Sequence, residues 1–160
     1  MTKAPGRTAR HHALNDLIAR TLVSAGIPVT KEPNDLSRSD GKRPEGLNLV
    51  PWKEGKPLPW DTTVVCTVAD SCSVCERFSQ RRARLLGTYL SQTLVVESLG
   101  TVEEATSSFL AELGHRISAL SGDSREIGFL FQRVSVLVQR FNSVLLRESF
   151  AADSRAKDDL

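Results

Sequence analysis

The sequence predicts an α/β fold in which a mixed four-stranded sheet is flanked by helices, in the order α-β-β-β-α-β-α-α. One observation is the segment 58–68, whose side chains alternate between two faces and which is dense in β-branched residues. A second is the helical spacing of apolar residues in long stretches before and after it. Three strands in a meander, then a helical crossover to a fourth, give a mixed sheet.

The N-terminal part is predicted to contain one helix and three strands. Apolar residues recur at helical spacing over 10–25, and Gly26 ends this helix. The polar segment EGKP, centred on Gly55, is expected to be the turn between the second and third strands. Three segments that are rich in apolar and β-branched residues are the predicted strands: 27–32, 47–50 and 58–68.

The C-terminal part is predicted to contain three helices and the fourth strand. The strand is the apolar run 93–97, which Gly100 ends. We expect a single domain over residues 10–148, a disordered lead-in over 1–9 and a polar tail over 149–160. Helical periodicity and capping residues place the helices at 74–90, 102–120 and 125–147.

Composition is that of a soluble globular protein, with 40% hydrophobic and 25% charged residues in a chain of 160. No apolar run approaches the roughly 18 residues that span a bilayer, and the N-terminus lacks the apolar stretch of a secretory signal. Three cysteines favour a reducing compartment, so we expect an intracellular protein, nuclear or cytoplasmic. The net charge of +2 does not by itself indicate nucleic-acid binding.

Two acidic residues stand near the starts of adjacent predicted strands, Glu45 in RPEG and Asp61 in PWDTTV. Carboxylates on neighbouring strands repel each other unless a cation or a proton lies between them, and Mg²⁺ prefers oxygen ligands. Aspartate is disfavoured inside strands, so Asp61 needs a partner or an ion. Glu32 is a third candidate ligand. The alternatives are a solvated turn residue for Glu45 and an exposed residue before a proline turn for Glu32.

Basic residues that could hold phosphate follow the third strand. Thr63 shares a face with Asp61, at the place where metal-dependent phosphodiesterases often carry a lysine. Arg77, Arg81 and Arg84 lie on one face of the next predicted helix and could supply that charge, although a solvated basic face is the simpler interpretation.

Other polar residues have weaker signals. Gln139 and Asn142 lie one turn apart on the last predicted helix, where they could cap neighbouring backbone or contact a nucleic-acid backbone. Cys72 and Cys75 form a lone CxxC pair, whereas a structural zinc site needs four ligands.

Several motifs together resemble the PD-(D/E)XK, or restriction-endonuclease-like, domains of retroelement-associated proteins of invertebrates. The resemblance covers residues 10–145, and its order and spacing are more specific than any single motif. The motifs are RHHALND at 10–16, EP at 32–33, DGKRPEG at 40–46, LVPW at 49–52, PWDTTVVCT at 59–67, VVESLG at 95–100, FLAELGHRI at 109–117 and VSVLVQRFN at 134–142.

The resemblance implies a restriction-endonuclease-like core and a Mg²⁺- or Mn²⁺-dependent endonuclease acting on DNA, associated with a retroelement either as a stand-alone protein or as part of a larger retroelement protein. It places the family's RPD motif on Glu45, its WD motif on Asp61 and its first-strand acid on Glu32. It also suggests that one residue at the head of the first helix, His11, His12 or Asn15, borders the cleft. Thr63 takes the position of the motif lysine. Arg81 and Arg84 match a Lys-x-x-Lys-Tyr element on the following helix.

The chain departs from the family pattern at two places. Glutamate replaces aspartate at Glu45, and arginines replace the helix lysines, with Leu85 in place of tyrosine. Arginine holds phosphate well but is a poor proton acceptor. Two functions therefore remain open: an active endonuclease, and a catalytically inactive nuclease-like domain that binds nucleic acid or a protein partner.

Overall fold

The computed structural model describes residues 5–34, 36, 43–65 and 89–158, and it confirms the α/β class with a mixed four-stranded sheet. The strand order is β1-β2-β3-β4, with β1–β2 and β2–β3 antiparallel and β3–β4 parallel. The elements are α1 (Pro5–Ser24), β1 (Val29–Lys31), β2 (Gly46–Asn48), β3 (Pro59–Val65), β4 (Gln92–Glu97), α3 (Glu104–Ser121) and α4 (Glu126–Asp158).

Two helices are longer than the sequence predicts. α1 begins at Pro5 within the predicted lead-in, where proline suits the first helical position. Its start packs on α4, since a Cβ at Gly6 would lie 2.7 Å from Leu145 Cδ2. α4 continues to Asp158 through the predicted polar tail, whose alanines, arginine and lysine are good helix formers. The helix predicted over 74–90 falls almost entirely outside the described residues, and Tyr89 and Leu90 are not helical.

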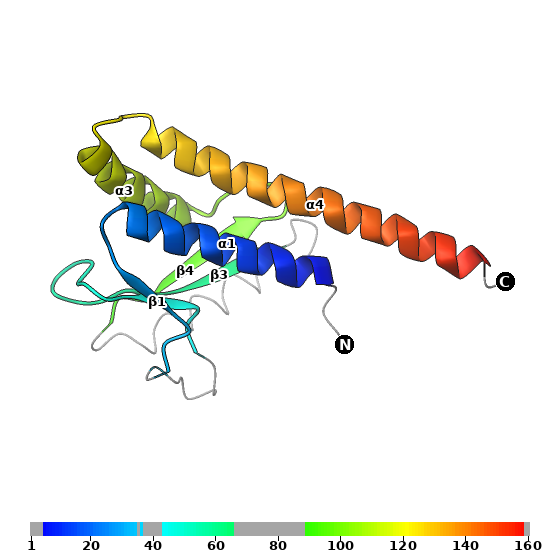
Figure 1. Ribbon diagram of the computed structural model, residues 1–160, viewed down its shortest axis with the longest axis horizontal. Coiled ribbons are helices and arrows are strands. Elements are labelled where there is room, and N and C mark those ends of the chain that lie inside the picture. Colours follow the sequence, from blue (N-terminus) through cyan, green and yellow to red (C-terminus); the bar gives the residue numbers. More distant parts are fainter. Residues whose placement is uncertain (1–4, 35, 37–42, 66–88, 159–160) are drawn as a thin grey trace.

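The core lies between the sheet and the three helices that the structure describes, all of which lie on the same side of the sheet, with α4 packed against α1 and α3 (Figure 1). Each helix contributes a row of apolar side chains spaced by three or four residues, as an amphipathic helix does. Their buried members are Leu14, Ile18 and Leu22 of α1, Leu110, Leu113 and Ile117 of α3, and Leu130, Val134 and Val138 of α4; the sheet adds Trp60, Leu94 and Val96.

β3 alternates as the sequence predicts over its described length. Trp60 is 1% exposed, and its Nε1 donates to Asn15 Oδ1 of α1 at 2.9 Å, so this side chain faces the helices. Thr62 faces the same way. Asp61 and Thr63 therefore leave the strand on the opposite face. Among the described residues, no helix combines the length and the apolar character that crossing a membrane requires.

The start of α3 covers the outer side of β4. Thr106 is 1% exposed, and its Oγ1 accepts from the backbone N of Val95 at 2.8 Å. The backbone N of Glu103 donates to Val95 O at 3.2 Å, and the Glu103 carboxylate caps α3 by accepting from Thr106 N. The Thr106 side chain and the Glu103 backbone thus make hydrogen bonds to Val95 of β4 that a fifth strand would otherwise make.

Thr106→Val is expected to lower the free energy of unfolding by about 1–3 kcal/mol, because valine leaves the buried Val95 N–H without its acceptor. Urea unfolding followed by circular dichroism measures this change. The matched control is Thr101→Val, at an exposed threonine, which is expected to have little effect. Equal effects of the two substitutions would contradict the role of the Thr106 hydroxyl.

Candidate functional site

Glu45 lies immediately before β2, at a local irregularity of the sheet. Gly46 pairs with Trp60, yet the backbone N of Glu45 also donates to Trp60 O, at 3.1 Å. Two residues of one strand therefore oppose one residue of the other, which is the arrangement of a β-bulge. A bulge changes the direction of the side chain that precedes the regular strand, and here it turns Glu45 toward α1.

The carboxylate of Glu45 is held by β3 and α1 together. Its Oε2 accepts from the backbone N of Thr62 at 2.9 Å and also from the Thr62 hydroxyl. Its Oε1 forms an ion-pair contact with His11 Nε2, which lies 3.1 Å from Thr62 O. Because both neighbours of this nitrogen are acceptors, Nε2 carries the ring proton. Glu45 is thus fixed in position, with its side chain 18% exposed.

Asp61 approaches the same place from the other face of the sheet. Its Oδ1 accepts from the backbone N of Glu45 at 3.2 Å, so this carboxylate reaches the backbone directly before β2. Asp61 is half-buried. The two acids of the sequence prediction are therefore linked at the start of β2 through the backbone N of Glu45, with the Glu45 carboxylate held on the α1 side and Asp61 on the opposite side.

Glu32 is next to these acids along the sheet but does not join them. Its backbone N donates to Glu45 O at 3.0 Å, and its side chain is exposed. No three His, Cys, Asp or Glu side chains in the described part of the chain lie together as ligands of one metal ion. Mg²⁺ is commonly held by only one or two carboxylates, with waters and substrate phosphates completing its shell. Glu45 and Asp61 are thus two candidate carboxylate ligands, whereas a three-acid site with Glu32 is not formed among the described residues.

A basic pocket of about 470 Å³ opens beside Glu45, between the first turns of α1 and the end of β3. Arg7, Arg10, His11 and His12 line it from α1, and Thr62, Thr63 and Val64 line it from β3. Hydroxyl, imidazole and guanidinium groups are the side chains that bind phosphate in proteins. Arg7 and Arg10 were not among the site residues predicted from the sequence. Pro5 as a helix-starting residue was the available signal that α1 begins early enough to include Arg7.

Gln139 and Asn142 bind neighbouring backbone carbonyls, which is one of the two roles that the sequence predicts for them. The Gln139 amide donates to Leu99 O at 3.2 Å, and the Asn142 amide donates to Ser98 O. Arg10 of α1 donates to Asn142 Oδ1 at 2.8 Å. The two amides therefore hold the turn after β4 against α4 and link it to α1.

The remaining sequence candidates, Arg77, Arg81 and Arg84 as well as Cys72 and Cys75, lie outside the described residues. Compared with models of known protein families and with curated protein sequences, the chain matches none.

Proposed function

We propose that the chain is a nuclease-like domain that binds a divalent cation, Mg²⁺ or Mn²⁺, at the start of β2 and hydrolyses DNA phosphodiesters. The observation that supports this most strongly is the hydrogen bond that the Asp61 carboxylate accepts from the backbone N of Glu45, close to the residues of a basic pocket. Oxygen ligands for a cation and donors for a phosphate adjoin each other there. The resemblance to PD-(D/E)XK domains, in which acids at these two positions hold the metal, supplies the reaction class.

Each part of the site has a role in this proposal. A divalent ion bound there would polarise a phosphoryl oxygen and lower the pKa of a bound water. His11 and Thr62 hold the Glu45 carboxylate in a single position, and ligand groups that are fixed in advance bind and orient better. Arg7 and His12, both exposed on the pocket wall, are placed to bind the phosphate backbone of DNA.

Two observations, one at Glu45 and one at Thr63, favour a second function, which is DNA binding without cleavage. Both oxygens of Glu45 already have hydrogen-bonding partners, and Thr63 offers no ammonium group at the position of the family lysine. A nuclease-like domain with these features would bind DNA through the basic pocket without cleaving it. Such binding would be weakened by salt, because it depends on phosphate contacts.

Nicking of a supercoiled plasmid separates these functions. With Mg²⁺ or Mn²⁺ the purified chain is expected to produce nicked circles, and EDTA is expected to stop the reaction. An Asp61→Asn preparation purified in parallel controls for contaminating nucleases. DNA binding that weakens with salt, without nicking in either metal, would replace the first function by the second. If the chain neither nicks the plasmid nor binds DNA, both proposed functions are contradicted.

A further inference from the structure

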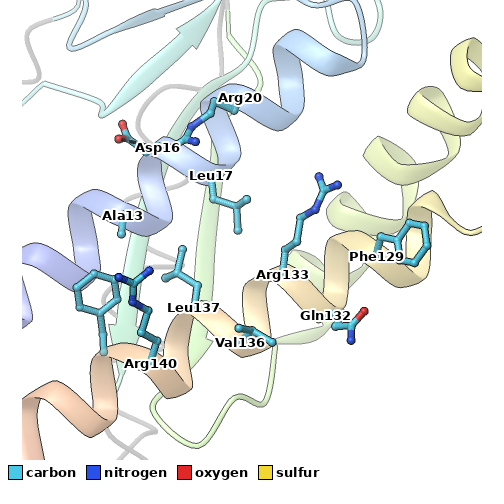
Figure 2. Close-up of a pocket in the computed structure, with 11 residues that line it drawn as sticks. Ala13, Asp16, Leu17, Arg20, Phe129, Gln132, Arg133, Val136, Leu137 and Arg140 are labelled. Carbon is cyan, nitrogen blue, oxygen red and sulfur yellow. Dashed lines mark ion pairs between the residues drawn. The ribbon is translucent and has the colours of Figure 1, made fainter.

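A second concave surface lies between α1 and α4, and none of its residues lines the basic pocket described above. This α1–α4 groove has a volume of about 760 Å³. Its floor is apolar: Leu17 of α1 and Leu137 of α4 face each other across it (Figure 2). Phe129 and Val136 extend the apolar surface along α4, with exposed fractions of 37% and 60%. An apolar side chain such as Val136, more than half exposed beside other apolar side chains, is typical of an interaction surface.

The charges around this floor are mainly positive. Arg20 of α1 and Arg133 and Arg140 of α4 line the groove from both helices. Asp16 is the one acidic residue among the described residues that line it, and it already contacts Lys31 and lies 3.9 Å from Arg20. The hydrogen bond from Lys31 lowers the pKa of Asp16, which keeps this pair ionised. No ion-pair partner for Arg133 or Arg140 is found among the described residues.

We propose that the α1–α4 groove binds an acidic amphipathic helix of a partner protein. Apolar side chains of that helix would pack on Leu17, Val136 and Leu137, and its carboxylates would pair with the arginines on either side. From Phe129 to Phe141 the groove follows α4 for about 18 Å, which is the length of a helix of about three turns. Phe129 and Val136 are seven residues apart, as are Arg133 and Arg140, so both kinds of contact repeat along the groove every two turns.

Charge complementarity favours this occupant over two others. A second copy of the chain that packed its own α4 here would bring Arg133, Arg140 and Arg147 against the same arginines. A nucleic acid would pair with the arginines but would cover the apolar floor with charged phosphates. An acidic amphipathic helix can cover the apolar floor and also pair with the arginines that flank it.

The probes are three labelled helical peptides of equal length, studied by fluorescence anisotropy with the full chain. The first has leucines at i, i+3, i+4 and i+7 flanked by glutamates; the second replaces the glutamates by lysines; the third replaces the leucines by serines. The wild-type chain is expected to bind only the first. Arg133→Glu combined with Arg140→Glu is expected to weaken that binding by about tenfold or more, because attractive pairs become repulsive.

Arg147→Glu is the control, since it reverses one charge on α4 outside the groove, as each substitution of the double variant does inside it, and it is expected to leave peptide binding unchanged. Equal binding of the first two peptides, no binding of the first, or an unchanged affinity in the double variant would overturn the proposal. So would self-association of the chain that Val136→Asp abolishes, or loss of DNA binding in the double variant. Plasmid nicking tests the other face of α1 and is independent of all these results.

Discussion

Replacing Gly46 with alanine is expected to lower the free energy of unfolding by about 3 kcal/mol, at the upper end of what overpacking costs. A Cβ at Gly46 would lie 2.0 Å from Trp60 Cζ2 and 2.3 Å from Cη2. The ring cannot move aside easily, because Trp60 is 1% exposed and its Nε1 is bonded to Asn15. Urea unfolding followed by circular dichroism measures the effect.

Gly128→Ala is the control for this substitution. Gly128 lies inside α4, and nothing is within 4 Å of an added Cβ. Alanine is the better helix former, so this variant is expected to be more stable than the wild type by about 0.5–1 kcal/mol. If Gly46→Ala were as stable as the wild type, the close packing of Gly46 on Trp60 would be refuted.

Asp61→Asn is expected to reduce metal-dependent nicking by about two orders of magnitude, which corresponds to the several kcal/mol that a bound metal ion contributes. Asparagine keeps the oxygen that accepts from the Glu45 backbone N at 3.2 Å, so the local structure is preserved. It removes the negative charge that would hold the cation. Initial rates of plasmid nicking at saturating Mn²⁺ give the comparison.

Glu54→Gln is the matched control, since it removes one negative charge at an exposed residue of the hairpin turn. This control is expected to nick at the wild-type rate. If Asp61→Asn also retained the wild-type rate, Asp61 would not be a catalytic ligand.

The hairpin that carries the site could be predicted from the sequence because its signals are local. Alternation over 58–68 identifies β3, and the turn that the polar segment EGKP predicts is present, with Gly55 at a φ of 71°. The direction of Glu45 could not be predicted in this way. A strict period of two assigns faces only within a regular strand, and the bulge at Glu45 interrupts that period. Beside the bulge, Gly46 packs closely on Trp60, fourteen residues away in the chain, which is a contact that no local signal predicts.

The early start of α1 was missed for a different reason. The side chains of Arg7, Thr8 and Ala9 are exposed, so they contribute no apolar periodicity. What holds this turn is long-range packing of Gly6 on Leu145 of α4. Likewise, no local signal decides between a structural and a nucleic-acid role for Asn142, because its backbone partner at Ser98 lies 44 residues away.

Titration with Mn²⁺, followed by calorimetry or by the electron paramagnetic resonance signal of the free ion, tests most directly whether Glu45 and Asp61 hold a cation. We expect the wild-type chain to bind the ion and Asp61→Asn to bind it at least about tenfold more weakly, since one of few protein ligands loses its charge. Glu54→Gln should bind as the wild type does. Identical Mn²⁺ binding by the wild type and Asp61→Asn would contradict a metal site at the start of β2.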